Sequence, residues 1–150
     1  SYGDILFRHY VLDLLMETDG DIVLVADAMW QERDPNPQSR LRDLVQCQEP
    51  FTTKYLDEDE VQLTSIGHYF AADDIQGEWI GLAKFSDAGA ERVRAEIAAM
   101  QGDGTATEAS MIDLFERLIQ SGETIHVIYI SGHWLDIDNA DDLADAQKFL

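Results

Sequence analysis

Cysteine is nearly absent from this chain of 150 residues, in which Cys47 is the single example. One thiol excludes an internal disulfide and a zinc site built from cysteines, and such scarcity favours a reducing compartment. Long apolar runs are absent too, since none approaches the roughly 20 residues that a helix needs to cross a bilayer. We therefore expect a cytoplasmic protein with no membrane-spanning segment.

Basic residues are also scarce. Ten lysines and arginines stand against thirty aspartates and glutamates, which gives a formal net charge of -20 at pH 7. Nucleic acid and anionic membranes repel such a polyanion, so we expect neither as a partner. Hydrophobic residues make up 45% of the chain, which is enough for a folded core at this length. We predict one domain over residues 1–150.

Strand-like and helix-like segments alternate along the chain. Apolar runs rich in β-branched residues occur at Ile22–Ala26 and Ile125–Ile130, and such runs are typical of strands buried on both faces of a parallel sheet. Apolar residues recur at helical spacing over Asp87–Met100 and again after Thr107, a candidate N-cap. The alternation predicts an α/β domain with a mainly parallel sheet and helices on both faces.

Three further segments complete this outline. Residues 31–50 are polar, contain all three prolines and are predicted to form a long loop. Phe51–Leu56 and Val61–Ile66 are predicted as two strands of an antiparallel insertion around an acidic tip. Trp79–Phe85 is predicted as a strand in which Gly81 lets a neighbouring segment approach closely.

Acidic residues stand where predicted strands end. Asp4 follows Gly3 at the end of the first strand, and Asp136 and Asp138 lie in an extended segment near the other end of the chain. Alternation puts Asp136 and Asp138 on one face of that segment, opposite Ile137. Carboxylates that lie together repel unless a cation such as Mg²⁺ intervenes. Each is also consistent with a solvated surface acid, and Asp138 with a cap of the last helix.

Two segments resemble the nucleotidyltransferase family. One is Tyr2–Phe7 (YGDILF), followed by a helix and the strand Ile22–Val25, and the other is Trp134–Leu143 (WLDIDNADDL). This family has a Rossmann-like fold and couples a nucleoside triphosphate to a sugar phosphate or a phospho-alcohol. The resemblance implies that Asp4 and Asp138 are catalytic residues that hold Mg²⁺.

The two segments are most similar to the cytidylyltransferase-like domains attached to phosphoenolpyruvate mutases. This similarity implies CTP as the nucleotide, a phosphonate or a phospho-alcohol as the acceptor, and a mutase as a fused or separate partner. Glu78–Leu82 resembles the segment that lines the acceptor pocket of the fold. The resemblance implies substrate contacts for Trp79, Gly81 and Asp136, and His133 beside the late motif is a further candidate.

The chain departs from the family's pattern at its start. Nothing in it corresponds to the glycine-rich loop, the arginine and the Pro-Lys pair that hold the triphosphate. The candidates to compensate are Arg8, Arg33, Arg40 and Arg42. We therefore expect that the N-terminal part of the fold is missing, that the isolated chain is inactive, and that an open sheet edge leads to a homo-oligomer. The alternatives are a catalytically silent binding or scaffold module and an acidic divalent-ion binder.

Overall fold

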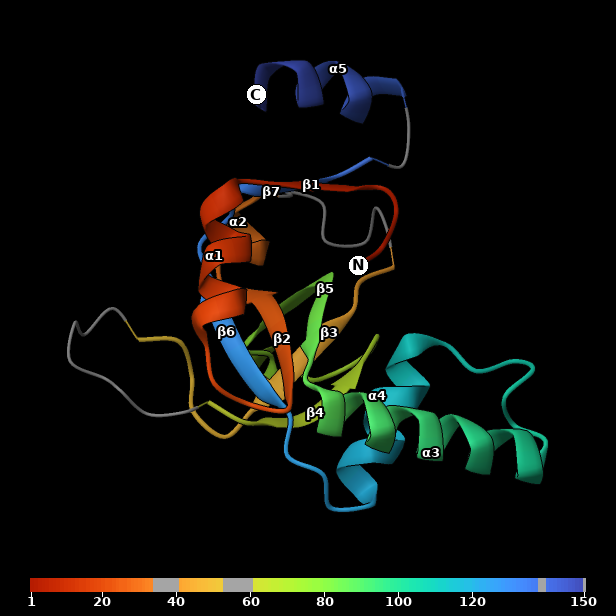
Figure 1. The fold of residues 1–150 in the computed structure, drawn as a ribbon. Helices are drawn as coiled ribbons and strands as arrows, with labels where there is room; N and C mark the ends of the chain where they lie inside the picture. The colour runs from red at the N-terminus through yellow and green to blue at the C-terminus, as the bar shows by residue number, and fades with distance from the viewer. Residues whose placement is uncertain (34–40, 53–60, 138–139, 150) are drawn as a thin grey trace.

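The computed structural model describes residues 1–33, 41–52, 61–137 and 140–149. Figure 1 shows a main sheet with helices on both faces and a separate pair of strands at the top, below the C-terminal helix. The strands are β1 (Ile5–Phe7), β2 (Ile22–Asp27), β3 (Leu44–Cys47), β4 (Leu63–Gly67), β5 (Gly77–Phe85), β6 (His126–Ile130) and β7 (Trp134–Asp136). The helices are α1 (His9–Glu17), α2 (Trp30–Arg33), α3 (Asp87–Asp103), α4 (Met111–Gln120) and α5 (Ala140–Phe149). None of the helices in these ranges is long and apolar enough to cross a membrane.

The main sheet is mixed in direction. Its strands lie in the order β4-β3-β5-β2-β6, and among the described strands β2 and β6 form the one parallel pair. The pairs β2–β5, β3–β5 and β3–β4 are antiparallel. The prediction of a mainly parallel sheet is therefore not confirmed. β2 contains a continuous apolar run and is buried at every position. Such a run indicates that both faces of the strand are covered, but it does not indicate whether the neighbouring strands are parallel or antiparallel.

The two outer strands of this sheet meet through residues at the start of β4. The amide of Leu63 donates to the carbonyl of Ile125 at 2.8 Å, and the amide of Val127 donates to the carbonyl of Val61 at 2.9 Å. One antiparallel bridge joins the segments between these bonds. The outer edge of β6 is covered along this stretch, so the open edge from which we expected an oligomer is not present there. The homo-oligomer itself stays a prediction.

The predicted antiparallel insertion is present, but with a different first strand. β4 pairs with β3, which lies inside the polar stretch that was expected to be a loop. Phe51 and Thr52 are not in a strand, and residues 53–56 lie outside the described part of the chain. β3 has four residues and only the first two are buried, so its apolar signal is too short to stand out in a polar context.

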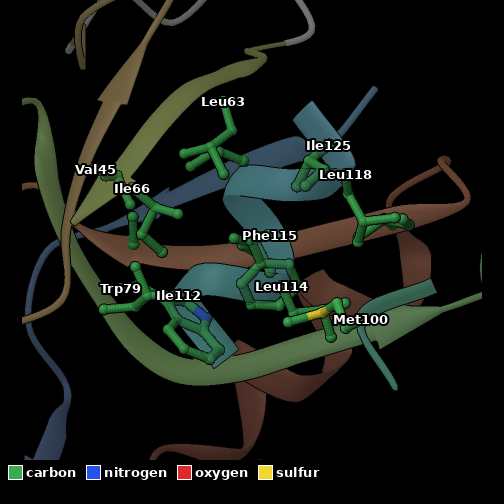
Figure 2. Packing of buried hydrophobic residues seen from close by; sticks show 14 residues of the cluster. Val45, Leu63, Ile66, Trp79, Met100, Ile112, Leu114, Phe115, Leu118 and Ile125 are labelled. Atoms are coloured by element: carbon green, nitrogen blue, oxygen red, sulfur yellow. The ribbon is translucent and has the colours of Figure 1, made fainter. Parts of the chain in front are cut away.

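Two apolar clusters attach helices to opposite faces of the main sheet. Successive residues of a strand face opposite ways, so Val23 and Val25 of β2 belong to the cluster of α1, whereas Ile22 and Leu24 belong to that of α3 and α4. Figure 2 shows the second cluster, with the fully buried ring of Phe115 of α4 among the strands. The expected cover of helices on both faces is present.

α4 begins later than its sequence pattern suggests, and its N-cap is Ser110 rather than Thr107. The amide of Asp113 donates to Oγ of Ser110 at 3.3 Å, and the amide of Ser110 donates to Oδ2 of Asp113 at 2.7 Å. Thr107 has Ser110 three positions later, which offers no carboxylate for this exchange. The reciprocal cap therefore forms at Ser110.

Candidate functional site

β1 and β7 form a two-stranded sheet, called here the β1–β7 ribbon. They are antiparallel with Ile5 opposite Asp136, and the amide of Ile137 donates to the carbonyl of Asp4 at 2.9 Å. Asp4 and Asp136, from opposite ends of the chain, therefore lie at the same end of the ribbon. The sequence predicted Asp4 at the end of a strand in a parallel sheet. It lies instead just before β1. The antiparallel pairing of β1 with β7 is what brings Asp4 and Asp136 to the same end.

A pocket of about 430 Å³ opens at this end of the ribbon, against the start of β5. It is lined by residues 2–5, 41, 43, 78–80, 134 and 136. Of the residues that the sequence singles out, Asp4, Trp79 and Asp136 thus share one pocket. Asp138 lies outside the described residues.

Tyr2 attaches the segment before β1 to β5. Its amide donates to the carbonyl of Gly81 at 2.9 Å, and its ring lies over that glycine. Gly81 has a φ of +78°, and a Cβ built there would lie 2.4 Å from Cδ2 of Tyr2. Only glycine combines this backbone conformation with this approach, as the sequence predicts. Gly81 is not among the residues that line the pocket and instead lies beneath Tyr2.

Trp79 forms a wall of the pocket rather than an open stacking platform. Its side chain is packed between the rings of Tyr2 and Phe115, with centroid distances of 5.0 and 5.2 Å. Its indole Nε1 donates to the carbonyl of Leu82 at 3.0 Å, and the residue is 4% exposed. A ligand would therefore meet one limited part of a fixed ring.

The hydroxyl of Tyr2 donates to Oδ2 of Asp43 at 3.0 Å. Burial raises the pKa of Tyr2, and so do the negative charge of Asp43, its hydrogen bond and the charges of Asp4 and Asp136. The phenol therefore stays protonated and keeps its donor role. His68 lies on the other side of Asp43, with Nδ1 3.5 Å from Oδ1.

The cations suggested by the sequence do not line the described pocket. Arg42 is 5% exposed, and its Nη1 contacts Oε2 of Glu78 at 2.7 Å, while the guanidinium lies 5.6 Å from the ring centroid of Trp30. Arg8 lies over the ring of Phe149 in α5 at 4.7 Å. Arg40 and the side chain of Arg33 lie outside the described part of the chain. Every charged side chain among the described lining residues is therefore acidic.

His133 faces α1 rather than the pocket. Its Nδ1 lies 2.7 Å from the hydroxyl of Tyr10, and the two rings meet edge to face. Its φ is +63°, which places it in the left-handed region within the turn before β7. It is not among the lining residues, so its contact with a substrate stays a prediction.

Asp27 is a residue of this region that the sequence interpretation passed over. It ends β2, is 0% exposed, and accepts hydrogen bonds from the amides of Met29 and Gly132 at 3.0 and 2.9 Å. Its Oδ2 also accepts from Nε1 of Trp134 at 2.9 Å. An aspartate directly after a buried strand, at the end where ligands gather in α/β sheets, was the available signal.

The donor set of the pocket fits a hard cation. Asp4 and Asp136 offer carboxylate oxygens, and Mg²⁺ uses one or two carboxylates together with substrate phosphates and water. No group of three or more potential ligands occurs among the residues that the structure describes. The metal site therefore stays a prediction whose other acid, Asp138, is outside those residues.

Comparison with known proteins finds a similar fold among solved structures but no match in sequence. No family model and no curated protein sequence matches this chain. The solved structure of the inositol-1-phosphate CTP transferase from T. maritima matches 98% of this chain with a TM-score of 0.65 and 17% identity. The chain shares the fold of a CTP transferase. It spans about half of that enzyme, since the match covers 51% of the other chain. The resemblance to nucleotidyltransferases is thus confirmed for the fold.

Proposed function

We propose that this chain serves nucleotidyl transfer, with CTP as the donor and a phosphonate or a phospho-alcohol as the acceptor. The observation that carries the proposal is the shared pocket of Asp4 and Asp136 within the fold of a CTP transferase. The T. maritima enzyme is named for inositol 1-phosphate. The candidate acceptors are therefore this ester, phosphocholine as another phospho-alcohol, and 2-aminoethylphosphonate as a phosphonate.

A divalent cation is needed because the acids of the pocket repel one another and an incoming triphosphate. We assign Mg²⁺ to Asp4 and Asp138, with Asp136 sharing the ion or supporting its ligands. When bound, the ion would neutralise developing phosphate charge and align donor and acceptor.

The reaction needs no covalent bond to the protein. An acceptor oxygen attacks the α-phosphorus of CTP, a P–O bond forms there, and the bond to the β-phosphate oxygen breaks to release pyrophosphate. The chain contributes by orientation, since the protonated Tyr2 hydroxyl and the buried Trp79 give the pocket a fixed wall.

Metal titration tests the site. We expect Asp4→Asn, Asp136→Asn and Asp138→Asn each to weaken Mn²⁺ or Mg²⁺ binding by at least about tenfold, a loss typical even of groups that only support metal ligands. Thermal stability of Asp4→Asn and Asp138→Asn without metal should hold or rise, because each change relieves repulsion between carboxylates. Asp19→Asn is the control, since this exposed acid precedes β2 while the pocket lies beyond its other end. Equal binding by all four variants would refute the site.

Turnover tests the extent of the activity. We expect the 150-residue chain to release no meaningful pyrophosphate from CTP with any of the three acceptors, because its described pocket offers the triphosphate no cationic side chain. Calorimetric titration with CTP in the presence of Mg²⁺ should still detect nucleotide binding. Rapid pyrophosphate release would show that our account of the phosphate-binding groups is wrong.

A catalytically silent module is the second candidate, and the buried pair of Arg42 and Glu78 favours it. This arginine, which the sequence offered for phosphate, is committed to a carboxylate in the interior. Such a module would act as a scaffold, with a phosphoenolpyruvate mutase as the predicted partner. Absence of CTP binding at millimolar Mg²⁺ would favour this function over transfer.

A further inference from the structure

Asp27 is a buried charged residue that does not line the pocket. A carboxylate with no exposed surface is tolerated where hydrogen bonds replace water, and both oxygens of Asp27 accept such bonds. The groups it binds come from two connections that leave the main sheet. The role of Asp27 therefore follows from the two connections that its carboxylate links.

The two oxygens of Asp27 have different partners. Oδ1 accepts from the amides of Met29 and Gly132, which fixes the turn after β2 to the turn after β6. Oδ2 accepts from the indole of Trp134, the first residue of β7. Gly132 and His133 both have positive φ, of 71° and 63°, so the chain reverses sharply just before β7. Asp27 therefore holds both the turn and the strand that follows it.

β7 carries this attachment to the pocket. Its last residue, Asp136, lies opposite Ile5, and the next amide, of Ile137, binds the carbonyl of Asp4. Trp134 is 3% exposed and packs with Val11 and Leu15 of α1. A shift of Trp134 would thus move the end of the ribbon that bears both acids.

We infer that Asp27 is a positioning residue of the candidate site: its bond to Trp134 holds the β1–β7 ribbon so that Asp4 and Asp136 face one pocket. The link to metal binding rests on the proposed function, whereas the attachment of the ribbon does not. Asp27 touches no ligand in this role and acts through β7.

Asp27→Asn separates the two sets of bonds. The amide oxygen of asparagine can replace Oδ1 and keep the bonds to Met29 and Gly132. Its NH₂ group then faces the indole N–H of Trp134, so a donor meets a donor. Trp134→Phe removes the same bond from the other side and keeps an aromatic ring in the cluster. Asp21→Asn is the matched control, because that carboxylate accepts from Ser86 at the opposite end of β2.

The test measures amide hydrogen exchange and Mn²⁺ affinity in the same proteins. In Asp27→Asn, exchange of the Ile137 amide should accelerate about tenfold or more, the effect of one lost bond to a charged group, while exchange within α3 stays unchanged. Mn²⁺ binding should weaken by about the same factor. Trp134→Phe should reproduce both effects, the double variant should equal either single variant, and Asp21→Asn should change neither.

Several outcomes would overturn the inference. Additive effects of the two substitutions would mean that Asp27 does not act through Trp134, and unchanged exchange at Ile137 would mean that it does not hold the ribbon. If Asp27→Asn fails to fold, Trp134→Phe decides alone, since unchanged exchange and Mn²⁺ affinity in that variant refute the link. If the wild-type protein binds no Mn²⁺, the proposed function is refuted. In that case amide exchange at Ile137 still tests whether Asp27 holds the β1–β7 ribbon.

Discussion

Replacing Gly81 with alanine would make the new methyl group clash with the side chain of Tyr2. The new Cβ would lie 2.4 Å from Cδ2, 2.8 Å from Cγ and 3.1 Å from Cβ of that tyrosine, all closer than normal carbon contacts. The neighbouring atoms belong to the near part of the side chain, which cannot swing away without moving the segment that leads to Asp4. Tyr2 must therefore move away from its packing position over Gly81 of β5.

Two costs contribute to the loss of stability. A left-handed backbone costs a residue other than glycine about 1–2 kcal/mol, and overpacking adds about 1–3 kcal/mol. Gly104 provides the matched control, because its φ is +82° and nothing lies within 4 Å of a Cβ built there. Gly104→Ala should therefore show the first cost alone. The change in the unfolded chain is the same for both substitutions and cancels in the comparison.

Urea unfolding of four variants measures these terms. We expect Gly81→Ala to lose about 1–3 kcal/mol more than Gly104→Ala, which is the steric part. In a Tyr2→Ala background, the cost of Gly81→Ala should fall most of the way to that of Gly104→Ala, because the two closest contacts are gone and the 3.1 Å contact with Cβ remains. Equal losses at the two glycines in the wild-type background, or no relief from Tyr2→Ala, would refute this reasoning.

Three further predictions concern other parts of the fold. Ser110→Ala should lower the free energy of unfolding by about 1 kcal/mol in urea, whereas Thr107→Ala should leave it nearly unchanged. Hydrogen bonds from Thr105 and Arg117 lower the pKa of Asp103 to about 2, so the stability this carboxylate adds is present above about pH 4 and lost as pH falls through 2. The stability gap between wild type and Asp103→Asn should shrink in that window. Burial raises the pKa of the Cys47 thiol to about 11, which lowers its thiolate fraction at pH 8 about 100-fold. Because a thiolate of higher pKa is also the stronger nucleophile, disulfide exchange should be about tenfold slower than in the urea-unfolded chain.

The sequence predicted those elements whose apolar pattern is long or continuous. β2, β5 and α3 lie where the apolar spacing placed them, and so does the apolar face of α4, although that helix begins later than expected. Strand direction was not available from the same pattern. β2 has the parallel neighbour β6 and the antiparallel neighbour β5, and its side chains are buried at every position whichever direction the neighbours run.

The sequence pointed to residues that line the candidate pocket but not to the geometry that brings them there. Asp4 and Asp136 were proposed from local motifs, yet their arrangement depends on a ribbon of two three-residue strands, which are too short to show an apolar period. Asp27 was missed because its role comes from Trp134, far away in the sequence. The cap of α4 could have been read correctly, since Ser110 and not Thr107 has an acid three positions later.

The pairing of β1 with β7 also determines when the pocket can exist during synthesis. Ile5 is made well before its partner Asp136, and roughly 7–26 s separate the two on a ribosome adding about 5–20 residues per second. Throughout that interval β1 has no strand to pair with, while β2, β5 and α3 are made in turn. The main sheet can gain β6 before β7 emerges, and Asp4 and Asp136 come together only after β7 has paired with β1. A nascent chain that stops before β7 therefore has most of a core and no pocket.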